Sequence, residues 1–190
     1  GAQSTQLSES LDDGRSWANI PALDLALGTS TPNSVTPVGG GELCLSANNP
    51  AAVVCSGGGV ATWDKTFTGG ADRVTTIYAW PPEAPVQVVF ADEQGVHVSE
   101  DDGQSWRLAQ AMPDDTAYTM TMADDGTLFL ATTSASLLRS TDGGDHWEDI
   151  AVRLPAQIFI MDPRPGFDAT AELLVGTHDG TYLVSDALGA

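Results

Sequence analysis

Short β-prone runs separated by turn residues recur along the whole chain. The clearest example is the run Tyr118–Ala123, the turn Asp124-Asp125-Gly126 and the run Thr127–Thr132. Runs of this length, bounded by Asp and Gly, predict strands joined by tight turns. No segment keeps a 3.6-residue apolar period. The pattern therefore predicts an all-β chain of short antiparallel strands.

One polar motif occurs three times, as Ser-x-Asp-x-Gly-x-(Ser/His)-Trp. Extended segments precede and follow each copy, so we expect a hairpin turn in which Ser and Asp bond turn amides and Gly takes a positive φ. The Trp that opens the next strand should cover the turn with its apolar face. The copies comprise Ser10, Asp12, Gly14 and Trp17; Ser99, Asp101, Gly103 and Trp106; and Ser140, Asp142, Gly144 and Trp147.

The spacing of the motif reveals a longer repeat. Trp147 follows Trp106 by 41 residues, and Trp106 follows Trp17 by 89, about twice that period. The gap should hold an altered copy, and Gly59–Phe67 aligns with Gly95–Ser99 if its turn is shortened and Lys65 replaces Asp101. A fifth, incomplete copy, Gly180–Gly189, ends the chain. Four strands in roughly 40–45 residues is typical of a β-propeller blade.

These turns resemble Asp-box repeats, also known as bacterial neuraminidase repeats. Sialidases, sortilin-type receptors, xyloglucan-cleaving glycosidases and photosystem assembly factors carry such repeats on β-propeller blades. The resemblance covers essentially residues 1–190, as a single propeller domain or propeller fragment of about four blades. It implies that the boxes are structural turns between third and fourth strands, away from the ligand face, and it implies no particular chemistry.

The repeat count leaves the assembly open. The chain should begin at the third strand of one repeat and end at the third strand of another, with four periods between. It is then a fragment of a larger propeller, a half-ring completed by a homodimer, or a small closed ring. Unclosed blades leave edge strands, which favour pairing with another chain.

Charge and motifs exclude several classes of function. The 26 Asp and Glu against 7 Lys and Arg give a net charge of −19, which disfavours nucleic acid and anionic membranes as partners. No stretch of 18 apolar residues predicts a membrane span. The sequence has no phosphate loop, dinucleotide fingerprint or nucleophile elbow. His97, His146 and His178 fall at different places in the repeat, so we expect neither a metal site nor a cofactor.

The two cysteines flank a predicted hairpin. Cys44 and Cys55 lie on β-prone runs either side of the turn Asn48-Asn49-Pro50, and a turn centred at 49–50 places them opposite each other, within disulfide range. The alternative is a pair of reduced, buried cysteines. A disulfide would indicate an exported protein, extracellular or periplasmic.

The candidate binding residues lie on loops of the ligand face that the resemblance implies. Asp92, Glu93, His178 and Asp179 are predicted to converge near the axis of a small ring, as an acidic mouth for a cation or a sugar, although ordinary solvated loop charge also explains them. Trp80, before Pro81-Pro82, is a candidate aromatic contact or a strand-end packing residue.

Two functions remain in view. The first is a non-enzymatic, exported propeller module that binds protein or carbohydrate. The second is a glycoside hydrolase fragment, sialidase- or xyloglucanase-like, with two acidic loop residues in catalysis. Sialidase chemistry is disfavoured because three of the six arginines, Arg15, Arg107 and Arg139, lie in or beside the boxes and the Arg-Ile-Pro motif is absent.

Overall fold

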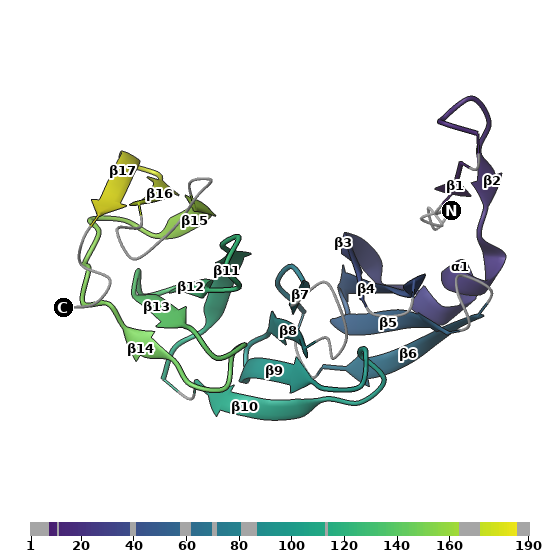
Figure 1. The fold of residues 1–190 in the computed structure, drawn as a ribbon, viewed down its shortest axis with the longest axis horizontal. Helices are drawn as coiled ribbons and strands as arrows, with labels where there is room; N and C mark the ends of the chain where they lie inside the picture. Colours follow the sequence, from purple (N-terminus) through teal and green to yellow (C-terminus); the bar gives the residue numbers. More distant parts are fainter. Residues whose placement is uncertain are drawn as a thin grey trace.

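The computed structural model describes residues 8–10, 12–38, 41–57, 62–69, 72–80, 87–112, 114–163 and 172–185. These residues form five antiparallel sheets that follow one another along an open arc (Figure 1). The predicted four-stranded β repeat is confirmed. Each sheet is a meander, because strands that are neighbours in sequence are also neighbours in the sheet.

The first two sheets occupy the N-terminal half. A hairpin of β1 (Ser8–Glu9) and β2 (Ala18–Asn19) comes first. The first four-stranded sheet contains β3 (Thr31–Pro37), β4 (Leu43–Asn48), β5 (Ala52–Gly57) and β6 (Thr62–Thr68).

Three further sheets complete the arc. The second four-stranded sheet contains β7 (Tyr78–Trp80), β8 (Gln87–Ala91), β9 (Gly95–Ser99) and β10 (Arg107–Ala111). The third contains β11 (Ala117–Met122), β12 (Leu128–Thr132), β13 (Leu137–Ser140) and β14 (Glu148–Asp149). The last sheet contains β15 (Ile158–Pro163), β16 (Glu172–Thr177) and β17 (Gly180–Ser185).

Every full sheet has the same orientation in the arc. The first strands, β3, β7 and β11, line its concave side, and the fourth strands, β6 and β10, lie along its convex rim (Figure 1). The second and third Ser-x-Asp motifs join a third strand to a fourth, as expected, and the first joins β1 to β2 of the two-stranded sheet. The loops between second and third strands and between sheets lie at the opposite strand ends.

One short helix interrupts the all-β pattern. The helix α1 (Pro21–Leu27) lies in a chain that the sequence pattern predicts to be all-β. Pro21 suits the first helical turn because its missing N–H is not needed there. Leu23 and Leu27, one turn apart, are buried against Leu45, Val54 and Trp63. Seven residues are too few for a periodic signal, which is why the pattern does not reveal the helix.

The core lies between neighbouring sheets. Phe90 of the second four-stranded sheet, and Ile77 just before its first strand, pack against Val53 of the first. Phe129 of the third is buried with Ile158 of the last sheet. Burying such side chains is worth about 1.5–3 kcal/mol each. The angle between sheets is thus set by apolar contacts that repeat at every junction.

The predicted alignment of the altered repeat copy is wrong. The third strand is β5, ending at Gly57, and its pairing with β6 sets Ser56 opposite Trp63. Ser56 and Trp63 precede Ser99 and Trp106 by the same 43 residues. The turn is therefore as long as the others, and Lys65 lies within β6, not at the position of Asp101. Residues 58–61 lie outside the described residues. The alignment failed because it followed the Gly-Val dipeptide at 59–60 instead of the longer apolar run 52–55.

Candidate functional site

The second Ser-x-Asp turn, residues 99–106, shows how the motif works. Ser99 Oγ accepts a hydrogen bond from Gly103 N at 2.9 Å and donates one to Asp101 Oδ1 at 2.7 Å. Asp101 accepts from Ser105 N at 2.8 Å and from Ser105 Oγ at 2.5 Å. Gly103 has φ +83° and Asp102 has φ +56°, a left-handed pair that bends the chain around the two side chains.

The other two turns repeat this network. In the first turn, residues 10–17, Asp12 accepts from Ser16 N and Ser16 Oγ, both at 2.7 Å. In the third turn, residues 140–147, Asp142 Oδ1 accepts from His146 N at 3.0 Å and its Oδ2 lies 2.6 Å from His146 Nδ1. Three segments of different sequence thus reach one geometry through the shared Ser, Asp and Gly.

The turn carboxylates are held in their charged form. The side-chain and backbone hydrogen bonds from Ser16 lower the pKa of Asp12. Burial raises the pKa of Asp101, but the hydrogen bonds from Ser105 and Ser99 outweigh burial, so the pKa lies below its usual value. Burial also raises the pKa of Asp142, and the hydrogen bonds from His146 lower it, with a net lowering. A carboxylate engaged in this way is poorly suited to general acid catalysis, which needs a raised pKa.

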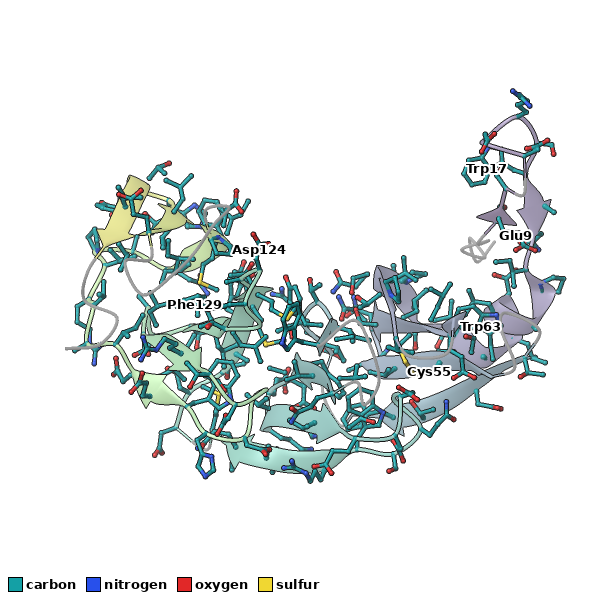
Figure 2. The ribbon with its side chains drawn as sticks, in the orientation of Figure 1. Glu9, Trp17, Cys55, Trp63, Asp124 and Phe129 are labelled. Atoms are coloured by element: carbon teal, nitrogen blue, oxygen red, sulfur yellow. A yellow bond between two sulfur atoms is a disulfide. The ribbon has the colours of Figure 1, made fainter. Side chains whose placement is uncertain are left out.

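The tryptophans of the turns differ in what they contact. Trp106 packs edge-on against Phe90 at 4.7 Å, and its Nε1 donates to Thr66 Oγ1 of β6 at 3.0 Å. Trp147 Nε1 donates to Gly144 O at 2.9 Å, and its ring packs on the cluster around Val89. Trp17 is 67% exposed, on the hairpin that projects from the N-terminal end of the arc (Figure 2).

A disulfide joins Cys44 on β4 to Cys55 on β5, with an S–S distance of 2.01 Å. The two residues are direct partners in the β4–β5 register. The bond lies beneath the second turn, where a Cβ on Gly103 would come within 2.5 Å of Cys44 Sγ and 2.7 Å of Cys55 Sγ. The bridge therefore packs one sheet onto the turn of the next.

Asp92 is buried inside the β8–β9 turn. Its Oδ1 accepts from Gln94 N at 2.8 Å and lies 3.0 Å from His97 Nε2. The His97 ring is stacked on Phe90 at 4.9 Å and tilted against Phe67 at 4.8 Å. Asp92 is only 2% exposed, so its surroundings are those of a turn-forming and core residue. Glu93, the next residue, is exposed.

The two predicted pairs of loop residues lie on different sheets. His178 and Asp179 lie in the β16–β17 turn, where the His178 ring is tilted against Phe159 at 5.0 Å. The whole β11–β14 sheet lies between this turn and the one that carries Asp92 and Glu93 (Figure 1). A shared role for the four residues stays a prediction.

Trp80 ends β7 and is half-buried. A Cβ on Gly126 would lie 2.3 Å from Trp80 Nε1, so the indole covers the β11–β12 turn of the next sheet. Pro81 and Pro82 lie outside the described residues. The contact with Gly126 supports the prediction that Trp80 is a strand-end packing residue.

A small hollow between the second and third four-stranded sheets was not singled out from sequence. Its volume is about 200 Å³, and Arg73, Glu93, Thr116 and Tyr118 are among its lining residues. Arg73 Cζ lies 4.8 Å from the centre of the Tyr118 ring. Arg73 and Tyr118 are 45 positions apart, and no local motif links residues so distant.

The rim of this hollow is fixed by Asp115. Its carboxylate accepts hydrogen bonds from Thr116 N, Thr133 Oγ1, Ser134 N and Ser134 Oγ. Burial raises the pKa of Asp115, but the hydrogen bonds from Ser134, Thr132 and Thr116 outweigh it and lower the pKa to about 2. Asp115 thus ties the segment before β11 to the β12–β13 turn.

Within the described ranges, no group of three or more His, Cys, Asp or Glu side chains is placed to hold a metal ion. No helix among the same residues is long and apolar enough to cross a membrane.

Comparison with known proteins identifies the fold. The sequence matches no protein-family model and no curated protein. By structure, the chain is similar to YCF48 from Cyanidioschyzon merolae, with TM-score 0.61, 13% identity, 96% of this chain and 63% of that one covered. An ancestral GH74 enzyme gives TM-score 0.72, 15% identity and coverage of 94% and 28%. YCF48 bound to a D1 peptide gives 0.64, 16%, 97% and 59%.

The chain thus spans less than two thirds of each of these proteins. Identities this low establish the fold alone. YCF48 and the GH74 enzymes are β-propeller proteins, and four-stranded antiparallel sheets in sequence order along an arc are propeller blades. The protein therefore has a β-propeller fold.

Proposed function

We propose that this chain is a non-enzymatic, exported propeller module whose Ser-x-Asp turns are Asp boxes and whose loop face binds a protein segment. The observation that carries the proposal is the use of the turn side chains. In all three turns the Asp and Ser side chains are engaged in hydrogen bonds within the turn, which leaves binding to the loops at the other strand ends.

Two further observations support the proposal. The structural neighbour YCF48 has been solved with a D1 peptide, which makes a protein segment the preferred ligand over a carbohydrate. The Cys44–Cys55 disulfide suits an oxidising compartment, which supports export.

A peptide array tests the proposal. We expect the purified chain to bind a subset of immobilised peptides, and Tyr118→Ala to lose at least half of those signals. The matched control is Leu108→Ser on the convex rim, an exposed side chain, which should keep them. Equal binding by both variants would contradict a binding role for the loop face.

The second candidate is a glycoside hydrolase fragment, which the likeness to a GH74 enzyme favours. Two carboxylates on loops would act as acid and as base or nucleophile. Incubation with xyloglucan and chromogenic glycosides decides between the candidates. Our proposal expects no turnover; cleavage that disappears in Asp179→Asn or Glu93→Gln would establish the hydrolase instead.

A further inference from the structure

The hollow between the second and third four-stranded sheets carries two charges of opposite sign. Arg73 comes from the segment before β7 and Glu93 from the β8–β9 turn, and both line the same space of about 200 Å³. Pockets for drug-sized ligands usually measure about 300–1,000 Å³. This hollow therefore suits a molecule smaller than a drug-sized ligand.

Arg73 is held differently from three other arginines of the described residues. Arg107, Arg139 and Arg153 are each ion-paired with a carboxylate. Among the described residues Arg73 makes no such pair, and its guanidinium lies over Tyr118 instead. A ring beneath the guanidinium restricts its motion and leaves its N–H edges for a ligand.

Glu93, like Arg73, has no ion-pair partner among the described residues. Within the described parts of the chain, its carboxylate forms neither a hydrogen bond nor an ion pair, including with Arg73. Its position is nevertheless fixed, because the preceding Asp92 holds the turn through Gln94 N and Gly95 N. The nearby Asp115 is fully engaged with Thr and Ser donors and does not compete for Arg73.

The overall charge decides which ligand fits. A chain of net charge −19 repels anions, and Arg73 repels cations at close range. A neutral zwitterion avoids the long-range repulsion and satisfies both groups. Val74, Ala91 and Ala117 supply apolar wall beside the two charges.

We propose that this hollow binds a free α-amino acid with an apolar side chain. Its carboxylate takes the guanidinium edge of Arg73, its ammonium group takes Glu93, and its side chain contacts Val74 and Ala117. An arginine–carboxylate pair of this kind is commonly bidentate. This inference does not depend on a protein partner for the loop face.

Three related probes test the charge requirement. Valine carries both charges, valinamide lacks the carboxylate and N-acetylvaline lacks the ammonium group. Followed by amide shifts in NMR titrations of the whole chain, valine should cause saturable shifts around Arg73, Glu93 and Tyr118. Each single-charge analogue should bind at least about tenfold more weakly, because hydrogen bonds to charged groups are worth about 1.5–3 kcal/mol.

Two variants assign the charges to the residues. Arg73→Ala should bind valine and valinamide equally weakly, and Glu93→Gln should bind valine and N-acetylvaline equally weakly. Arg107→Ala, on the convex rim, should retain the affinity of the native chain for valine. Both binding-site side chains are exposed, so folding should persist, which circular dichroism verifies.

Two results would overturn the inference. One is the absence of saturable shifts with valine up to its solubility limit. The other is equal binding of valine and N-acetylvaline by the native chain, which would make the hollow an anion site. In either case a positive peptide array would leave the proposed binding module intact.

Discussion

The first and second Ser-x-Asp turns are locally the same and globally different. Gly14 and Gly103 have φ of +82° and +83°, and the two hydrogen bonds from Ser16 to Asp12 match those from Ser105 to Asp101 within 0.2 Å. Yet Gly103 is buried against the disulfide of the preceding sheet, whereas the nearest atom to a Cβ on Gly14 is in the turn's own Trp17, at 4.0 Å.

This difference separates two sources of order. The turn conformation follows from Ser, Asp and Gly alone, because it forms with or without a neighbouring sheet. The energy that a turn contributes between blades depends on the preceding sheet. Among the described residues, no sheet covers the outer side of the first turn, and Trp17 is exposed there (Figure 2).

The largest expected difference is between Gly103→Ala and Gly14→Ala. A left-handed Ala costs about 1–2 kcal/mol at either site. At Gly103 the methyl group also meets two sulfur atoms at 2.5 and 2.7 Å, and overpacking adds about 1–3 kcal/mol. Urea unfolding should therefore show a loss of about 2–5 kcal/mol for Gly103→Ala and of about 1–2 kcal/mol for Gly14→Ala. Equal losses would show that the second turn is not packed on the disulfide.

Removing the disulfide sharpens the same contrast. The double variant Cys44→Ala, Cys55→Ala should lose about 2–4 kcal/mol of unfolding free energy. Because it also removes the sulfur atoms that face Gly103, Gly103→Ala should cost less in that background, by at least about 0.5 kcal/mol in a double-mutant cycle. Gly14→Ala is the control and should cost the same in both backgrounds.

The tryptophans give a smaller contrast. Trp106→Ala removes the contact with Phe90 and the hydrogen bond to Thr66, and we expect a loss of about 2–3 kcal/mol, below the full range for a buried aromatic residue because Trp106 is only half-buried. Trp17→Ala should change the unfolding free energy by about 0.5 kcal/mol or less. A large loss for Trp17→Ala would mean that something covers the first turn in solution.

The smallest expected effect is on the pKa values of Asp12 and Asp101, and it should be equal in the two turns. The pKa values of Asp12 and Asp101 both lie below 3.8. A lowered folded-state pKa adds stability above pH 3.8, and this stability is lost as the pH falls through the folded value. Ser16→Ala and Ser105→Ala should each return the pKa of their Asp toward 3.8, as followed by NMR titration of the carboxyl carbons. A shift in only one turn would show that the two networks are not equivalent.

Features that are short in range or repeated could be predicted from the amino-acid sequence. The turn at Ser99–Trp106 combines side chains within eight residues, and its recurrence gave the blade period. The opposed cysteines followed from one hairpin. The predicted alignment was wrong at Ser56 and Trp63, where the turn has no Asp and only the strand pairing shows the register. The sequence also could not show that Asp92 points into the protein, because buried and exposed turn residues have the same local sequence pattern.

The amino-acid sequence by itself determined the strands, the turns and their four-strand period, because each depends on contacts within a few residues or on their repetition. Only the tertiary structure decided which turns are covered, and that Arg73 and Tyr118 meet beside Glu93. Those contacts join different sheets, and they depend on how apolar faces pack across each junction. The same distinction explains why the fold could be foreseen while the hollow could not.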